Sequence, residues 1–126
     1  SEETPRSDRH HSILIAEDVY ENDFLLETLF GKQYQLYHAL NGQEAIDMVE
    51  TYHPDLILMD IKMPVMDGFE ATRRIRTLSK TIPIIALTAF AFEREKEIAR
   101  QCEFTDYVVK PIDIKELKKL IVKVLA

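Results

Sequence analysis

Short runs of consecutive apolar residues restrict the fold more than any other feature of this sequence. Apolar and polar residues do not alternate within them, which predicts strands covered on both faces, as in a parallel sheet flanked by helices. The runs are residues 13–16, 56–59, 84–87 and 107–109. Residues 34–39 alternate more, which is typical of an edge strand.

Amphipathic stretches between the runs predict the connecting helices that parallel strands require. The first helix is predicted at about residues 20–30. An Asn or Asp stands three residues before a Glu at Asn41, Asp67 and Asp113, and this spacing predicts three helix starts. A further helix at residues 93–101 is mostly charged, so we expect it to be weakly anchored and able to move. A well-solvated helix face explains the same charges equally well.

Strands alternating with helices predict an α/β domain with a doubly wound sheet. Right-handed crossovers then place the first and third strands side by side, because helices must cover both faces. In such sheets ligands bind at the edge where the carboxyl ends of the strands meet. Functional side chains are therefore expected directly after the strands.

Composition describes a single acidic globular domain. A chain of 126 residues is too short for a second core. We expect residues 1–12 to form a tail or linker, where the adjacent His10 and His11 lack supporting metal ligands, and residues 13–126 to form the domain. A net charge of -6 argues against nucleic-acid binding, and no apolar run approaches the about 20 residues of a membrane span. The single Cys102 excludes an internal disulfide and, with no signal peptide, favours the cytoplasm.

Carboxylates follow two of the predicted strands at positions that the topology brings together. Glu17 and Asp18 follow the first strand, and Asp60 follows the third. Three anions in a small volume repel one another, and a hard cation such as Mg2+ relieves this repulsion with oxygen ligands. Asp18 has an alternative role as a cap of the first helix. Three acids at adjacent strand ends favour the metal site.

Two further strand ends add polar groups to the same edge. Thr88 closes the fourth strand with a hydroxyl, and Lys110 follows the fifth with an ammonium. Alone, each is an ordinary strand or surface residue, but together with the acids they suit phosphoryl transfer onto Asp60. The metal and Lys110 offset the repulsion between a carboxylate nucleophile and an anionic phosphoryl group, and Thr88 can donate a hydrogen bond to it.

These motifs resemble those of the response-regulator receiver domains of two-component signalling. The matching segments are Glu17-Asp18, Met59-Asp60, residues 63–68, Leu87-Thr88-Ala89, Tyr107 and Lys110-Pro111. The resemblance covers residues 13–126 and implies a flavodoxin-like (βα)5 fold with five parallel strands in the order 2-1-3-4-5.

For the site, the resemblance implies that Asp60 accepts a phosphoryl group from a phosphohistidine, with Lys110 assisting. Asp18, Asp60 and the backbone carbonyl of Lys62 would bind Mg2+, with Mn2+ as a substitute. Glu17 would act on the ion through a water molecule.

Thr88 and Tyr107 match the switch pair of the family. Thr88 would move to the phosphoryl group on Asp60, and Tyr107 would enter the space that Thr88 leaves, which shifts an existing equilibrium. A static, half-buried Tyr107 is the alternative. The domain is thus expected to be a phosphoacceptor switch with at most slow autodephosphorylation rather than an enzyme.

The implied partner is a histidine kinase or a histidine phosphotransfer domain, contacted through the first helix and Phe24. The alternative is that the apolar residues of this helix lie mostly in the core. We expect no nucleic-acid binding, no membrane insertion, and a monomer or a weak phosphorylation-dependent dimer. Asn22 and residues 41–45 resemble receivers of hybrid histidine kinases. The chain is therefore expected to be cytoplasmic, either free-standing or as the cytoplasmic end of a membrane-bound hybrid kinase.

Two departures from the family pattern carry predictions. Cys102-Glu103-Phe104 occupies a turn where the family commonly has Gly, so the preceding helix is expected to end differently. Lys62 and Phe90 stand where the family tunes dephosphorylation, and neither easily orients an attacking water. The phosphoryl group is therefore expected to be long-lived.

Two other classes of function compete with this reading. A metal-dependent phosphatase with an aspartyl nucleophile usually has a second Asp two residues after the first, where this chain has Lys62. A degenerate receiver used only for docking would not need the acids, Thr88 and Lys110 together. Turnover of a small phosphate ester would support the first alternative, and failure to bind Mg2+ or beryllofluoride would support the second.

Overall fold

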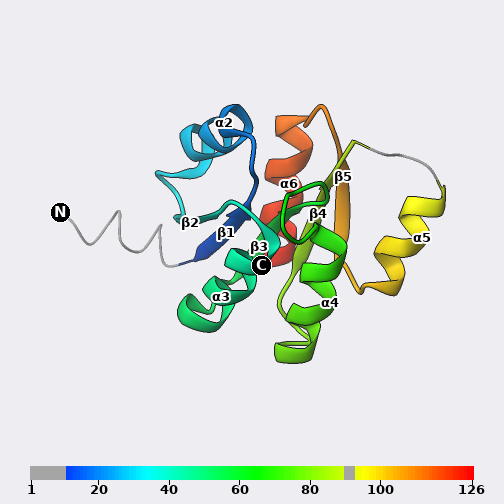
Figure 1. Ribbon diagram of the computed structural model, residues 1–126. Helices are drawn as coiled ribbons and strands as arrows, with labels where there is room; N and C mark the ends of the chain where they lie inside the picture. Colours follow the sequence, from blue (N-terminus) through cyan, green and yellow to red (C-terminus); the bar gives the residue numbers. More distant parts are fainter. Residues whose placement is uncertain (1–10, 90–92) are drawn as a thin grey trace.

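The structure is a computed structural model that describes residues 11–89 and 93–126. Its sheet contains five parallel strands in the order β2-β1-β3-β4-β5, as predicted (Figure 1). The strands are β1 (Ser12–Ala16), β2 (Gln35–Ala39), β3 (Leu56–Asp60), β4 (Ile84–Thr88) and β5 (Asp106–Val109). The helices are α2 (Tyr20–Phe30), α3 (Gly42–Tyr52), α4 (Gly68–Leu78), α5 (Glu93–Gln101) and α6 (Ile114–Leu125).

Helices cover both faces of the sheet, which accounts for the unalternated apolar strands. α2 and α6 pack on one face, where Leu26 and Ile121 meet Ile13 and Ile15 of β1. α3 and α4 pack on the other face, and α5 lies beyond β4 and β5 at the end of the sheet opposite β2 (Figure 1). Every residue of β3 is buried, so this central strand is fixed between two packed layers.

Side-chain caps start three helices where the sequence predicted them. Asn41, Asp67 and Asp113 accept hydrogen bonds from backbone N–H groups three residues later, at 2.9, 2.9 and 3.2 Å respectively. α2 differs because its N-cap residue is Val19, and no side chain caps it. The alternative role of Asp18 as a helix cap is therefore wrong.

The C-terminal end of α5 corrects the expectation that this helix ends differently because its turn lacks a glycine. Glu103 adopts a left-handed conformation with φ 68°, which is the conformation that glycine takes at a helix end. Its N–H donates to the carbonyl of Arg100 at 3.0 Å, and the N–H of Phe104 donates to the carbonyl of Ala99 at 3.2 Å. The buried Arg76 donates to the Glu103 carbonyl at 2.9 Å and holds this turn. The helix therefore keeps its glycine-type ending despite the missing glycine.

β1 begins at Ser12, one residue earlier than the apolar pattern indicates. Ser12 pairs with Gln35, and its N–H donates to the Asp55 carboxylate at 2.7 Å. Of the rest of the predicted tail, residues 1–10, including His10, lie outside the described residues, and only His11 is described. Among the described helices, none has the length and apolar character that a membrane crossing requires.

Candidate phosphoacceptor site

The topology brings Glu17, Asp18 and Asp60 together at the carboxyl edge of the sheet. Glu17 and Asp18 directly follow β1, and Asp60 is the last residue of the neighbouring β3. One carboxylate oxygen from each residue lies within 4.8 Å of those of the other two. Glu17 is 1% exposed and Asp60 is 4% exposed, whereas Asp18 lies at the surface. The predicted acid cluster is therefore present, with its opening on the Asp18 side.

Lys110 follows the carboxyl end of β5, and its side chain extends to the acid cluster. Its Nζ lies 3.3 Å from Oδ1 of Asp60 and 3.4 Å from Oε1 of Glu17. Its backbone N–H donates to the carbonyl of Thr88 at 2.7 Å, which ties the ends of β4 and β5 together. The following Lys110–Pro111 peptide bond is cis. The ammonium is thus held between two acids of the cluster.

The buried acids repel one another despite this lysine. Burial raises the pKa of Glu17 from its ordinary 4.5 to about 7, and the adjacent Asp60 adds to the rise. Lys110 and the N–H of Val19 act in the opposite direction and do not cancel it. A cation with oxygen preference would relieve this repulsion, and an all-oxygen donor set suits a hard metal ion. The cluster could therefore hold a metal.

A pocket of about 230 Å³ opens above the cluster. Asp18, Asp60, Lys62, Thr88 and Lys110 all contribute to its walls. This pocket is large enough for an ion, water and a phosphoryl-sized group, and it joins all the predicted site residues except Glu17 and Tyr107.

Two glycines fix the loop that follows Asp60. The N–H of Gly68 donates to the carbonyl of Ile61 at 2.8 Å, and a Cβ at Gly68 would clash with the backbone carbonyl of Asp60. Gly42 of α3 donates to the carbonyl of Met66 at 3.0 Å, and a Cβ there would clash with the same carbonyl. In the sequence, Gly42 is recognisable only as the residue after the helix cap Asn41. Its contact with Met66 joins segments far apart in the chain, so no local pattern indicates it.

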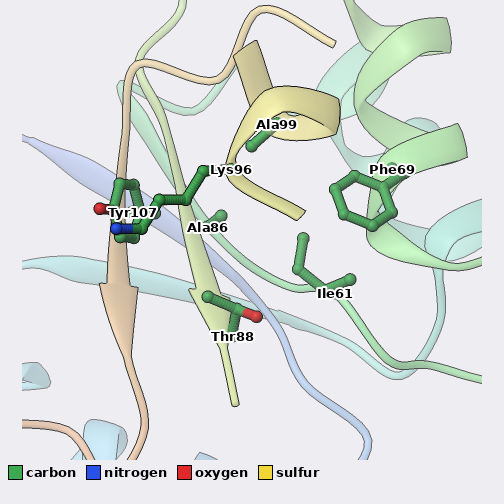
Figure 2. A pocket seen from close by; sticks show the side chains of 7 residues that line it. All are labelled: Ile61, Phe69, Ala86, Thr88, Lys96, Ala99 and Tyr107. Atoms are coloured by element: carbon green, nitrogen blue, oxygen red, sulfur yellow. The ribbon is translucent and has the colours of Figure 1, made fainter. Parts of the chain in front are cut away.

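Thr88 and Tyr107 border a second, much smaller cavity beneath α5. Thr88 ends β4 and is 7% exposed, whereas Tyr107 on β5 is 37% exposed. The void between them has a volume of about 10 Å³, room for about one water molecule. Its other lining residues are Ile61, Phe69, Ala86, Lys96 and Ala99 (Figure 2). A tyrosine ring does not fit there unless other side chains move.

The start of α2 exposes aromatic side chains beside the site. Tyr20 is 72% exposed and stacks on Phe24, which is 57% exposed, with ring centroids 6.0 Å apart. Leu26 and Phe30 of the same helix are buried in the core. The apolar residues of α2 thus divide between core and surface, and the exposed Tyr20 follows Asp18 by two residues in the chain.

Comparison with known families agrees with this geometry. The family model described as response regulator receiver domain matches residues 13–122. The chain belongs to this family. It is a receiver domain of two-component signalling, and such domains act as phosphoacceptor switches.

Curated relatives differ in how much of their own length this chain covers. The chain is 36% identical over 121 residues to sporulation initiation phosphotransferase F of Bacillus subtilis, which covers 92% of this chain and 94% of that protein. It is 37% identical over 114 residues to regulatory protein AtoC of Escherichia coli, covering 90% of this chain. The chain spans only 25% of the length of that second relative.

Solved structures show the same fold. The receiver domain of the sensor histidine kinase PA1611 of Pseudomonas aeruginosa has 34% identity and a TM-score of 0.85, over 91% of this chain and 97% of that one. That structure has a magnesium ion coordinated in its active site cleft. The receiver domain of Ssk1 of Saccharomyces cerevisiae, solved with the phosphotransfer protein Ypd1, has 31% identity and a TM-score of 0.84, over 90% of this chain and 87% of that one.

Sequence reasoning missed one residue at the small cavity. Lys96 of α5 lines it together with Tyr107. In the sequence Lys96 lies within the charged segment 93–97, where every side chain resembles a solvated surface group. Only the packing of α5 on β5 distinguishes it.

Proposed function

We propose that Asp60 is the phosphoacceptor of this receiver domain and takes its phosphoryl group from a phosphohistidine of a histidine kinase or histidine phosphotransfer domain. The observation that carries the proposal is the position of Asp60. Its carboxylate ends the central strand β3, lines the open pocket, and lies 3.3 Å from the Lys110 ammonium. It is the one acid of the cluster that combines a rigid strand position with access to that pocket and the ammonium contact.

In the transfer, an oxygen of Asp60 forms the new bond to phosphorus while the phosphorus–nitrogen bond of the phosphohistidine breaks. The bonding electron pair returns to the imidazole, which leaves and takes up a proton. Lys110 would move from its contact with Asp60 to an oxygen of the phosphoryl group, and Thr88 would donate its hydroxyl to another.

The donor set suits Mg2+, with Mn2+ as a substitute. Asp18, Asp60 and the backbone carbonyl of Lys62 would hold the ion, and Glu17 would act through a bound water. When bound, the ion neutralises charge between the carboxylate nucleophile and the phosphoryl oxygens. The raised pKa of Glu17 and the close approach of three carboxylate oxygens support this assignment.

Phosphorylation would then shift the equilibrium of the Thr88 and Tyr107 pair. About two negative charges arrive at Asp60, and Thr88 is drawn toward them. The void of about 10 Å³ cannot admit the ring of Tyr107 until Thr88 leaves, so the two movements are coupled. The sparse apolar anchoring of α5, with Ala99 the only buried residue within its helical turns among those described, suits an element that responds.

Docking of the phosphodonor is proposed on the exposed aromatic face of α2. Tyr20 and Phe24 present a stacked apolar surface next to Asp18, where a phosphohistidine would enter. The complex of Ssk1 with Ypd1 shows that a related receiver binds a phosphotransfer protein. The relay would operate in the cytoplasm, with the chain from Ser12 onward as the receiver, because β1 begins there, and the preceding residues as its tail or linker.

We also propose a long-lived phosphoryl group. Lys62 is exposed, and its ammonium offers hydrogen-bond donors but no acceptor that would align a water for attack on phosphorus. The second residue of this prediction, Phe90, lies outside the described residues. A phosphoryl lifetime of seconds in Mg2+ buffer would contradict the proposal.

Incubation with a small acyl phosphate tests the assignment. Intact-mass measurement should show phosphorylation of the wild type in Mg2+ and none in EDTA. Asp60→Asn should remain unmodified, whereas Asp47→Asn, which changes an exposed acid of α3, should be modified like the wild type. Equal phosphorylation of Asp60→Asn and wild type would overturn the proposal.

A further inference from the structure

Lys96 lies against the ring of Tyr107, the residue proposed to turn during switching. Its Nζ lies 5.6 Å from the centroid of the Tyr107 ring (Figure 2). The same ammonium lies 3.6 Å from Oε2 of Glu93, whose side chain is 86% exposed. Interaction with the Tyr107 side chain, followed by the charge of Glu93, raises the pKa of Lys96, so it is charged at neutral pH. An ammonium at this distance from an aromatic ring is attracted to it.

This contact depends on the orientation of Tyr107. The ring is now at the mouth of the small cavity, with Lys96 beside it and Thr88 below (Figure 2). If the ring turned inward, it would enter a space whose walls are mostly apolar side chains. The Lys96 ammonium could not follow, because it would lose both water and Glu93 without gaining a partner. The attraction therefore favours the outward ring.

We propose that Lys96 is a positioning residue that holds Tyr107 outward and so limits how often the unphosphorylated domain adopts its active arrangement. This inference rests on the proposed function of Asp60 and of the Thr88 and Tyr107 pair. A contact present in only one of two states shifts their equilibrium by its own energy. For a partly exposed ammonium on an aromatic ring, the shift corresponds to roughly a two- to fivefold change.

Beryllofluoride binding in Mg2+, measured as a dissociation constant, tests the inference because the ligand is a phosphoryl analogue. Lys96→Met keeps the side-chain length over the cavity and removes the charge. We expect it to lower the dissociation constant roughly two- to fivefold, because turning Tyr107 inward no longer breaks a contact with the Lys96 ammonium. Simple charge removal near an anion site predicts the opposite, weaker binding.

Three controls accompany this variant. Lys96→Arg keeps the cation and should bind like the wild type. Arg100→Met removes another cation of α5, one that pairs with Glu97, and should also bind like the wild type. In a Tyr107→Ala background, Lys96→Met should have no effect, because the contact is already gone.

A second measurement reads the orientation of Tyr107 directly. With 3-fluorotyrosine incorporated, the fluorine resonance that disappears in Tyr107→Phe belongs to Tyr107. Without beryllofluoride, Lys96→Met should move this resonance toward its position in the beryllofluoride complex. An unchanged resonance together with unchanged or weaker binding would overturn the role of Lys96. If the wild type fails to bind beryllofluoride at all, the proposed function of Asp60 fails instead.

Discussion

The raised pKa of Glu17 predicts that the metal-free domain loses stability as the pH rises. The folded-state pKa is about 7, against an ordinary value of 4.5. An acid whose pKa is raised by folding opposes folding above its unfolded-state pKa, and this opposition is complete above its folded-state pKa. The difference between the two values corresponds to about 3 kcal/mol at pH 8 and to less than about 1 kcal/mol at pH 5.

Asp60→Asn removes part of this cost. Burial is the largest cause of the raised pKa and remains in the variant, whereas the hydrogen bond and the charge of Asp60 are the next two causes and disappear. We therefore expect the substitution to raise the free energy of unfolding by about 1 to 2 kcal/mol at pH 8 and by much less at pH 5. Mg2+ should raise the stability of the wild type at pH 8 and reduce its difference from the variant.

Urea unfolding followed by circular dichroism, between pH 5 and pH 8 in EDTA, measures this effect. The contribution of His38 to stability also changes with pH, because folding raises its pKa, so the informative quantity is the difference between variant and wild type at each pH. Asp47→Asn is the matched control, because it removes an exposed acid of α3 that is not part of the cluster. A difference that is the same at pH 5 and pH 8, or a destabilised Asp60→Asn, would refute the reasoning.

Three further predictions concern other parts of the fold. His38 lies 2.6 Å from Asp23 and 2.7 Å from Glu27, one carboxylate at each ring nitrogen, which after the opposing cost of burial raises its pKa. The stabilisation of the fold by protonated His38 is complete below pH 6.5 and is lost as the pH rises through its folded-state pKa. In urea unfolding, His38→Gln should therefore lower the free energy of unfolding by roughly 1 kcal/mol at pH 6 and by less at pH 9. Glu103→Gly should raise the free energy of unfolding by about 1 kcal/mol by relieving the left-handed backbone, whereas Glu103→Ala should not. Thr72→Val should raise the midpoint of thermal unfolding, because the buried Thr72 hydroxyl has no hydrogen-bond partner among the described residues and removing it gains about 1 kcal/mol.

The fold could be predicted because its signals are local. Each of three helix starts is indicated by a segment of four residues, from a capping Asn or Asp to a Glu, at Asn41, Asp67 and Asp113. The apolar runs likewise predict buried strands from consecutive residues alone. The acid cluster could be predicted for a related reason. Glu17 and Asp60 stand at strand ends, and right-handed crossovers with helices on both faces of the sheet place those ends side by side.

Other features depend on contacts that no local pattern encodes. Lys96 resembles its charged neighbours until α5 is packed against β5, and only then does it meet Tyr107. Glu103 keeps the helix ending expected of glycine because Arg76, 27 residues earlier, donates to its carbonyl. The departure of this turn from the family pattern therefore changes its energy and leaves its shape intact.

The position of the phosphoryl group is the most direct test of the central claim. The domain would be phosphorylated by a small acyl phosphate in Mg2+, reduced with borohydride, and digested for peptide mass spectrometry. Borohydride converts an aspartyl phosphate to homoserine, so phosphorylation of Asp60 predicts homoserine at position 60 in the wild type and none in Asp60→Asn. Reduction at Asp18 or Glu17 instead, with Asp60 unchanged, would contradict it.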